Sequence, residues 1–319
     1  MCWQYQARTM WLGCGDVTIE LGSINDCGDK DKAGHEVAKE DAGSGTKAGK
    51  CGKADCKNKQ GRTSIVYRVK EGLVWKSPRT SVSDTLLDEF QNAFAVEYKL
   101  LRRLQGHPGI IQCYGLFKTT PSMEDGLLLE EANLGDLQSY IDKNNATIPG
   151  YVRKQWSLQC AEALAYVHSK GVVHANVSTT NVLLHNLGQT TNLILADFGG
   201  SKCRELNLDG GLIPDDPFRD PQLKEFDSPK VDVFSLGIVI YIVITGHYPF
   251  REGKAPQGEE RYLYEEFVRQ RFGNGEFPEL INVQFGEVIA GCCIERRFDT
   301  AKDVVVALKA EMQVHAWST

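Results

Sequence analysis

The stretch that decides the fold is "VVHANVSTTNVLL", residues 172–184. It carries a polar sequence between two apolar runs, with His174 near its beginning and Asn181 near its end. This arrangement is typical of a catalytic loop held between buried segments. Asn176 occupies the position in which such a loop would carry its acid–base residue, and an amide can orient a hydroxyl group but is a negligible base. The stretch therefore raises three alternatives: an enzyme, a weakened enzyme, or a binding protein built on an enzyme's fold.

The length and composition are those of an ordinary globular protein. The chain has 319 residues, of which 42% are apolar and 24% are charged, enough for two packed lobes or two modest domains. The net charge is −6, which makes broad nucleic-acid binding a poor prospect, so we expect no nucleic-acid partner. The most apolar segment, residues 234–246, falls short of the roughly 20 residues that a membrane-spanning helix needs. We therefore expect a buried helix there and no membrane span.

The cysteines and the N-terminus favour a location inside the cell. Ten Cys residues are scattered along the chain, several of them within apolar runs, where a free thiol packs as a small apolar group. No His follows Cys51 and Cys56 at the spacing of a zinc finger. Residues 1–17 lack the basic start and the continuous apolar stretch of a secretory signal. We therefore expect free thiols and an intracellular, cytoplasmic protein.

Residues 1–60 are predicted to be a divergent N-terminal segment. Residues 26–60 contain one Val and no Leu, Ile, Phe, Met, Tyr or Trp, so they are predicted to be a disordered insert. Residues 16–24, "DVTIELGSI", are predicted to form a strand. Either this strand is the first one of the lobe that follows, with 26–60 inserted after it, or the whole of 1–60 is a disordered tail. An artefact of gene prediction within 26–60 is a third alternative.

Residues 61–132 and 133–319 are predicted to form two lobes. The first contains β-rich runs separated by turns and one amphipathic helix over 84–105, and it ends in a hinge. The second is mostly helical, with helices predicted over 151–171, 232–246 and 299–313. The predicted fold class is therefore α+β, with a small β-rich lobe that has one long helix, followed by a larger helical lobe. Ligands often bind in the cleft between such lobes.

Three segments, in this order, resemble those of the eukaryotic protein kinase family. "HANVSTTN", residues 174–181, resembles the catalytic loop His-Arg-Asp-x-x-x-x-Asn, and "ADFGGSK", residues 196–202, resembles the segment with the metal-binding triplet Asp-Phe-Gly. "KVDVFSLGIVIYIVITGHYPF", residues 230–250, is similar to the core helix of the family's larger lobe and argues against small-molecule phosphotransferases. The resemblance covers about residues 61–313. It implies the bilobal protein kinase fold with ATP and Mg²⁺ between the lobes.

The resemblance also assigns site residues. Lys76 would hold the α and β phosphates of ATP with Glu97 as its partner, and Asn181 and Asp197 would bind Mg²⁺ through oxygen atoms. A Lys and a Glu about twenty residues apart are commonplace, so this pair by itself is weak evidence. Leu129 would be the gatekeeper residue. The adenine site would be formed by a glycine of the phosphate-covering loop, by the backbone of the hinge and by apolar side chains on both sides of the ring: Gly61, Glu130, Ala132, Val66, Val74 and Leu183.

Several positions depart from the family's pattern in ways that affect activity. Asn176 replaces the Asp that orients the substrate hydroxyl and accepts its proton, and the loss of a general base lowers a rate by about 10²–10⁴. Ser178 replaces the Lys that would stabilise the transferring phosphoryl group. Ala175 replaces the Arg that would bind an activation-segment phosphate, and Ser201 is the one hydroxyl residue between positions 199 and 220. Regulation by phosphorylation of that segment is therefore not expected.

Two further departures concern the framework of the site. Gln222 stands where the family has a Glu that pairs with an Arg, here Arg297, and we expect the Gln carbonyl or a nearby acid to serve instead. The phosphate-covering loop keeps only Gly61, because Lys59 and Ser64 take the places of the other glycines. The hydrophobic column that marks a closed kinase would run through Leu101, Cys113, His174 and Phe198.

Three functional hypotheses follow. The first is a protein of the kinase fold that binds ATP with Mg²⁺ and transfers phosphate to protein Ser or Thr weakly or not at all. The second is an active, divergent Ser/Thr protein kinase, and the third is an interaction scaffold that binds no nucleotide. The catalytic-loop residues assigned to the site are His174, Asn176 and Ser178. The expected partner is a protein substrate or a regulatory protein, which the sequence does not identify.

Overall fold

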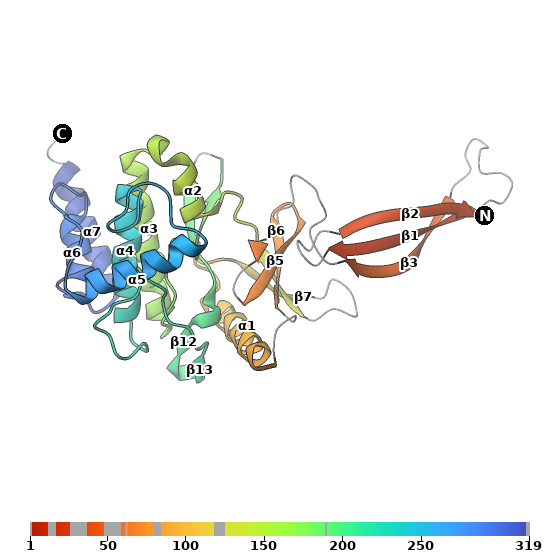
Figure 1. The fold of residues 1–319 in the computed structure, drawn as a ribbon, viewed down its shortest axis with the longest axis horizontal. Helices are drawn as coiled ribbons and strands as arrows, with labels where there is room; N and C mark the ends of the chain where they lie inside the picture. The colour runs from red at the N-terminus through yellow and green to blue at the C-terminus, as the bar shows by residue number, and fades with distance from the viewer. Residues whose placement is uncertain are drawn as a thin grey trace.

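The computed structural model describes residues 2–11, 17–25, 37–47, 59–60, 63–79, 84–117, 125–188 and 190–316. The described residues include the two expected lobes, a small lobe with a β-sheet and a large helical lobe (Figure 1). The α+β, bilobal prediction is therefore confirmed.

The small lobe is a five-stranded antiparallel sheet accompanied by one helix. The strand order is β4-β5-β6-β8-β7. Strands β5 and β6 meet at a tight turn in which Gly72 has φ +78°, a conformation that glycine adopts without a steric penalty. The elements of this lobe are β4 (Lys59–Gln60), β5 (Ser64–Lys70), β6 (Leu73–Pro78), α1 (Asp84–Leu104), β7 (Cys113–Phe117) and β8 (Gly126–Glu130).

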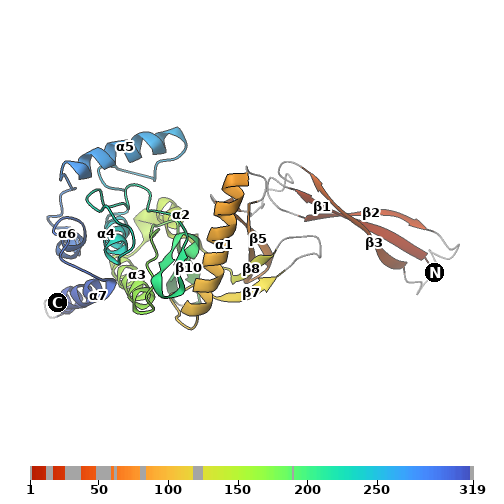
Figure 2. The same ribbon diagram turned by 90° about the horizontal axis from the view of Figure 1, so that it is seen from below.

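Helix α1 buries one face and carries a charged residue into the interior. Ala93, Val96, Leu100 and Leu104 recur at spacings of three and four residues, and each is at most 3% exposed. Glu97 lies on the same face and is 2% exposed. Figure 2 shows α1 between the sheet and the large lobe. The helix therefore places the carboxylate of Glu97 at the boundary between the lobes.

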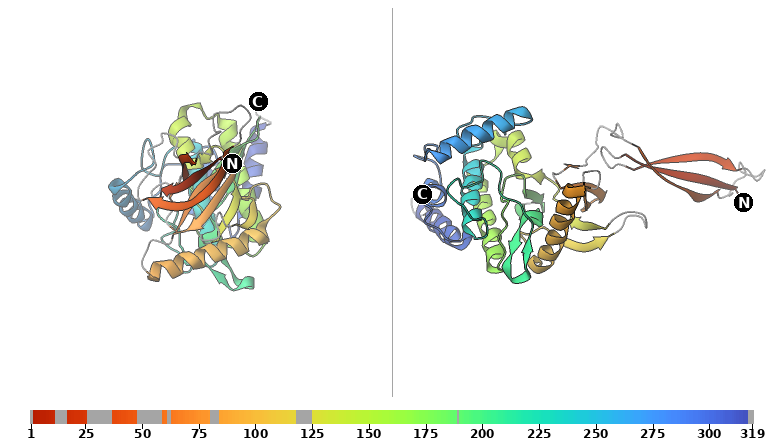
Figure 3. Two further views of the ribbon diagram at one scale, coloured as in Figure 1. Left: turned by 90° about the vertical axis from the view of Figure 1, so that its right-hand side faces the viewer. Right: turned by 60° about the horizontal axis from the view of Figure 1, so that its bottom comes forward.

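The large lobe is built around the apolar helix α4. All residues of α4 from Val231 to Val243 are buried, which explains why its sequence is apolar on nearly every side. Figure 3 shows the large-lobe helices gathered on the side away from the N-terminal strands. Within the described residues, no helix is both long and apolar enough to span a bilayer. The helices are α2 (Leu137–Asn144), α3 (Gly150–Ser169), α4 (Lys230–Thr245), α5 (Glu259–Gly273), α6 (Gly286–Cys293) and α7 (Ala301–Ala316), with short 3₁₀ turns η1 (Asn145–Thr147), η2 (Phe198–Gly200) and η3 (Arg204–Leu206).

Short strands of the large lobe flank the loops that face the small lobe. Strand β10 pairs with both β9 and β11, and β12 pairs with β13. The quoted stretch 172–184 thus runs from the end of α3 into β10. The strands are β9 (Gly135–Asp136), β10 (Val182–Asn186), β11 (Thr191–Leu195), β12 (Lys202–Cys203) and β13 (Leu208–Asp209).

The N-terminal segment differs from the expectation for residues 1–60. Strands β1 (Cys2–Trp11), β2 (Val17–Asn25) and β3 (Val37–Lys47) form a sheet of their own, ordered β2-β1-β3 (Figure 1). A strand is thus present close to 16–24, but the strand beside β5 is β4, so 16–24 is not the first strand of the lobe sheet. Strand β3 lies within residues 26–60, which the sequence predicts to be a disordered insert. A segment with few apolar residues can still pair as a strand, because the pairing uses backbone groups that every residue except Pro supplies in full. The boundaries at 60 and 132 stay predictions.

Candidate active site

Three charged groups meet between the lobes. The Nζ of Lys76, on β6, lies 2.7 Å from Oε2 of Glu97 on α1 and 2.8 Å from Oδ1 of Asp197. The side chains of Lys76 and Glu97 are 8% and 3% exposed, so this ion pair is shielded from water. Asp197 belongs to the large lobe, whereas the other two residues belong to the small lobe. One buried cation therefore joins the two lobes.

The environment of this triad keeps Lys76 and Asp197 charged. Burial by itself would lower the pKa of Lys76, but the carboxylates of Asp197 and Glu97 outweigh burial and raise it above its ordinary value. Burial would raise the pKa of Asp197, but Lys76 lowers it below its ordinary value. Burial raises the pKa of Glu97 although Lys76 opposes the shift. Asp197 is therefore the more firmly held anion of the two.

The backbone of the catalytic loop is held by Asp232, in the first turn of α4. Asp232 is fully buried and accepts hydrogen bonds from the N–H groups of His174, at 2.7 Å, and Ala175, at 2.8 Å. Nε2 of His168 donates a third bond, at 3.0 Å. Ala175 has φ +60°, a strained conformation for an L-residue, and the bond to Asp232 stabilises it. The loop is thus shaped by a carboxylate from another element.

His174 links the catalytic loop to the Asp-Phe-Gly segment. Its Nε2 donates to the carbonyl of Ala196 at 3.1 Å, and its ring centroid lies 4.7 Å from that of Phe198. Burial lowers the pKa of His174, so the ring is neutral near pH 7. Leu101 and Cys113 are 1% and 2% exposed and belong to the same core as Phe198. The four residues of the expected hydrophobic column are therefore all buried.

Asn176 and Asn181 are joined across the loop. Nδ2 of Asn181 donates to the backbone oxygen of Asn176 at 2.9 Å, so the amide oxygen of Asn181 is the atom presented to a ligand. The N–H of Ala196 donates to the backbone oxygen of Asn181 at 2.9 Å, which brings the neighbouring Asp197 close to it. An amide oxygen and a carboxylate are hard ligands that suit Mg²⁺. The chemistry of these two side chains therefore fits the expected metal.

Ser178 supplies no charge to the loop. It is 8% exposed, and its hydroxyl lies 3.0 Å from that of Thr180, so the two hydroxyls share a hydrogen bond. The basic side chain expected at this position is therefore replaced by a neutral group that is already engaged.

The register of the small-lobe sheet places the expected adenine residues on one face. Val66 pairs with Lys76, and Val74 pairs with Leu129. Directly paired residues project to the same face of a sheet, as do residues two apart on one strand. Leu129 is 6% exposed, whereas Leu183 enters from β10 of the large lobe and is half-buried. The residues expected above and below the adenine ring thus come from different lobes.

The hinge presents its backbone alternately in two directions. The N–H of Glu130 donates to Gln112 and the carbonyl of Ala132 accepts from Gly135, both at 3.0 Å. The N–H of Glu131 points instead toward β6 and donates to Gly72 at 2.9 Å. The remaining polar groups of Glu130 and Ala132 are the ones assigned to adenine by the resemblance. Gly61, assigned to the phosphate-covering loop, lies outside the described residues.

The part of the chain that forms these lobes matches a known family. Residues 60–297, more than half of the 319 residues, match the family model described as "Protein kinase domain". The chain belongs to the protein kinase family. Lys76, Glu97, the catalytic loop and the Asp-Phe-Gly segment all lie inside the matched residues.

Curated relatives of this kinase domain carry protein kinase names, and two of the three described here are named serine/threonine-protein kinases. The chain is 30% identical over 148 residues to serine/threonine-protein kinase kin-29 of Caenorhabditis briggsae, which is 45% of this chain and 18% of that protein. It is 29% identical over 167 residues to serine/threonine-protein kinase SIK1 of Rattus norvegicus, 51% of this chain and 21% of that protein. CBL-interacting protein kinase 11 of Oryza sativa subsp. japonica is 26% identical over 57% of this chain and 36% of its own length. The matched stretches thus cover less than two thirds of each of these relatives.

The activation segment expected from the resemblance, residues 199–220, contacts both the catalytic loop and helix α1. Its one hydroxyl residue, Ser201, is fully buried and donates to the carbonyl of His174 at 2.9 Å. Nδ2 of Asn92 on α1 donates to the carbonyl of Asp209 at 2.9 Å. At the end of α1, Arg103 forms an ion pair with Glu205 of the segment. Helix α1 is therefore tied to the activation segment at two points.

The Arg expected to pair near Gln222 is not Arg297. Arg296 forms a bidentate pair with Asp220, with Nε and Nη2 each 2.9 Å from a carboxylate oxygen. Arg297 instead donates to the carbonyl of Glu287 and lies 3.2 Å from Glu295. The expectation that Gln222 would pair with Arg297 is therefore wrong, whereas the alternative of a nearby acid for Arg297 is met by Glu295. The pair of Arg296 with Asp220 joins positions 76 residues apart, which local sequence does not reveal.

Replacing Arg296 by Met should destabilise the fold by about 2 kcal/mol, because the Asp220 side chain is 3% exposed and would lose its partner. The matched control is Arg297→Met, which breaks only exposed contacts and should lower the free energy of unfolding by about 0.5 kcal/mol. Urea denaturation measures both. Equal losses in the two variants would contradict the assignment of Arg296 as the structural partner.

Proposed function

We propose that this protein binds ATP with Mg²⁺ between its lobes and transfers phosphate to Ser or Thr of a protein only weakly. The observation that carries the proposal is the assembled triad of Lys76, Glu97 and Asp197 beside a loop in which Asn176 occupies the base position. The charged residues expected of a nucleotide site are thus assembled, and an amide stands where the proton acceptor is expected, which together support the proposal. The names of the relatives support Ser and Thr as the acceptor residues.

The residues of the chain would divide the work as follows. Lys76 would bind phosphate oxygens, and Glu97 would keep its long side chain from turning away. Asn181 and Asp197 would hold Mg²⁺, which supplies charge neutralisation between the phosphates. Glu130 and Ala132 would bind the adenine edge through their backbone groups. Each of these roles is positioning or electrostatic, and none requires a base.

Asn176 would limit the rate of phosphate transfer to the substrate hydroxyl. Its amide would orient the substrate hydroxyl but would not accept the proton, and the neutral Ser178 would leave the transferring phosphoryl group without a neighbouring cation. Phosphoryl transfer depends mostly on positioning and electrostatics, so a slow reaction would survive. The second candidate function, full Ser/Thr kinase activity, is favoured by the buried column and by the contacts that tie the activation segment to α1 and to the catalytic loop.

Nucleotide binding is expected to raise the melting temperature of the protein. A ligand that binds only the folded state stabilises it by RT ln(1 + [L]/Kd), about 2.7 kcal/mol when the ligand is at 100 times its Kd. We expect a shift with millimolar Mg-ATP, a smaller shift with ATP and EDTA, and a smaller shift for Asp197→Asn with Mg-ATP. Thermal denaturation followed by fluorescence measures it.

The absence of a shift in the wild-type protein would favour the third hypothesis, an interaction scaffold that binds no nucleotide. The control is GMP at the same concentration, which shares the ribose phosphate but lacks the adenine edge. An equal shift with GMP would mean that the hinge does not select adenine.

A further inference from the structure

Glu131, in the middle of the hinge, is bound to the small lobe through its side chain. Its Oε2 lies 2.8 Å from Nε of Arg68 on β5 and accepts a hydrogen bond from the N–H of Gly72 at 3.1 Å. The side chains of Arg68 and Glu131 are 36% and 16% exposed. The N–H of Glu131 also donates to the carbonyl of Gly72. One hinge residue thus makes three contacts with the β5–β6 hairpin.

The same residue is bound to the large lobe through its carbonyl. Nδ1 of His185, on β10, donates to the backbone oxygen of Glu131 at 3.0 Å. Further along the hinge, Asn133 exchanges two hydrogen bonds with the backbone of Asn186, at 2.8 and 3.1 Å. The hinge is therefore fastened to both lobes at neighbouring positions.

The contacts of Glu131 lie next to the residues that would enclose adenine. Arg68 pairs directly with Val74 and is two residues from Val66 on the same strand, so all three project from one sheet face. Glu131 follows Leu129 by two residues, and its contact with Arg68 shows that its side chain lies on that same face.

His185, which binds the carbonyl of Glu131, likewise lies beside a residue expected to contact adenine. His185 is two residues from Leu183 on β10, so the two side chains project from one face of that strand. Glu131 therefore connects the neighbours of the roof, the edge and the floor of one cleft.

We propose that Glu131 is a positioning residue that clamps the outer mouth of the adenine cleft by tying the β5–β6 hairpin, the hinge and β10 together. The ligand class is an adenine nucleoside or nucleotide, and the inference rests on the proposed nucleotide binding. The clamp presets the distance between roof and floor and the direction of the hinge backbone before the ligand enters. Such preorganisation lowers the entropy loss on binding.

The clamp predicts a loss of affinity that is confined to the adenine half of the ligand. Glu131→Gln keeps the shape and an acceptor oxygen but removes the charge, and charge-assisted hydrogen bonds are about twice as strong as neutral ones. We expect Kd to rise about five-fold for ATP and by the same factor for adenosine. Arg68→Met should give a similar rise in Kd. The double variant should bind ATP and adenosine no more weakly than either single variant, because both substitutions remove the same ion pair.

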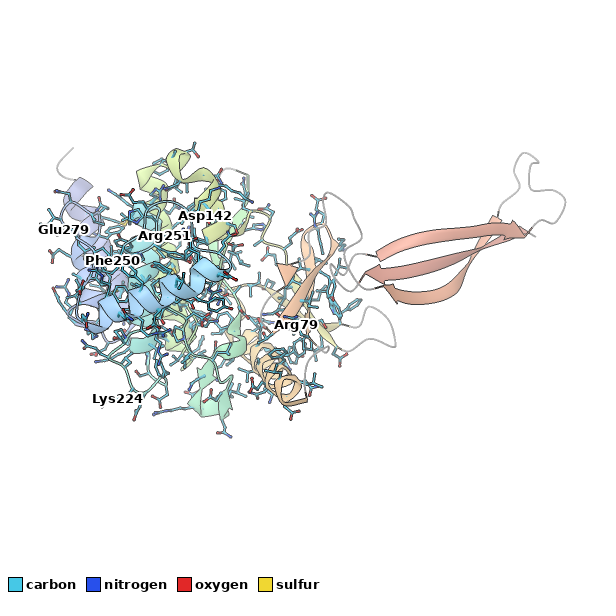
Figure 4. All side chains as sticks on the ribbon, in the orientation of Figure 1. Arg79, Asp142, Lys224, Phe250, Arg251 and Glu279 are labelled. Carbon is cyan, nitrogen blue, oxygen red and sulfur yellow. The ribbon has the colours of Figure 1, made fainter. Side chains whose placement is uncertain are left out.

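The matched control is Glu260→Gln, which breaks a comparable carboxylate pair with Arg251 in the large lobe, at 2.8 and 3.2 Å. Figure 4 labels Arg251, which lies in the large lobe. This exposed pair should leave both Kd values within about 1.5-fold of wild type. Isothermal titration calorimetry with ATP and with adenosine measures all of these proteins.

Hydrogen exchange of the nucleotide-free protein separates this inference from the function it rests on. Exchange of the amides of residues 126–134 should be faster in Glu131→Gln than in wild type and unchanged in Glu260→Gln. If wild type binds neither ligand, the proposed function fails, and exchange alone decides whether the clamp exists. Unchanged exchange, unchanged adenosine affinity, or a loss for ATP that far exceeds the loss for adenosine would overturn the clamp.

Discussion

Replacing Asn176 by Asp is expected to raise the rate of phosphate transfer to a protein substrate by about 10²-fold or more, within the 10²–10⁴ range of a general base. Asp and Asn have nearly the same shape, so the variant places an anionic proton acceptor where a neutral amide stood. The backbone of residue 176 is already fixed, because its N–H donates to His174 and its carbonyl accepts from Asn181. The measurement is ³²P transfer from ATP to a general protein substrate such as myelin basic protein.

The control for this gain is Asn176→Leu, which removes the hydroxyl-orienting amide and should lie at or below the wild-type rate. A wild-type rate within a few-fold of the Asn176→Asp rate would contradict the proposal of weakened transfer and favour an active divergent kinase. The double variant Asn176→Asp, Ser178→Lys should exceed the single one, because it adds a cation beside the transferring group. If neither variant transfers phosphate, the defect lies elsewhere, and the glycine-poor loop around Gly61 is the first place to look.

Replacing Lys76 by Met is expected to lower the free energy of unfolding by about 3 kcal/mol and to abolish the thermal shift with Mg-ATP. Lys76 is the shared cation of Glu97 and Asp197, and its removal leaves two carboxylates side by side with no counter-charge. Removing one partner of a buried ion pair is far more damaging than removing an exposed pair, because the remaining charge stays desolvated. Urea denaturation at pH 7 measures the loss of stability.

Lys309→Met is the matched control for Lys76→Met. It breaks the pair with Glu162, whose two side chains are 51% and 40% exposed, and should change stability by less than about 1 kcal/mol. A Lys76→Met protein as stable as Lys309→Met would mean that the triad contributes nothing to the fold. A Lys76→Met protein that keeps the full Mg-ATP shift would mean that the nucleotide lies elsewhere.

Local patterns predicted the elements and the order of the motifs. Helix α4 is apolar on nearly every side, and such a helix can only be buried, so its central place followed from residues 232–246. The spacing of His174 and Asn181, with Asp-Phe-Gly after them, was enough to indicate a protein kinase, and residues 60–297 match that family. The roles of the individual site residues stay predictions until the variants are measured.

Contacts between distant segments were not predictable from the same patterns. Arg296 and Arg297 are adjacent and chemically identical, and nothing local shows that the first one meets Asp220. A Glu at the end of a strand is ordinary, so the sequence does not distinguish Glu131, whose role depends on Arg68, Gly72 and His185. The strand beside β5 was assigned to 16–24 in one alternative, although the structure uses β4.

The sequence by itself determined the family, the two-lobed α+β plan and the presence of an amide, Asn176, where the family's pattern has an Asp. These follow from residue types at short spacings, which set local conformation and the chemistry of single side chains. Only the tertiary structure decided that Lys76 also meets Asp197 and that Arg296, not Arg297, meets Asp220. Such pairings depend on packing among segments up to 121 residues apart, because a charge can enter the interior only where the whole fold brings it a partner.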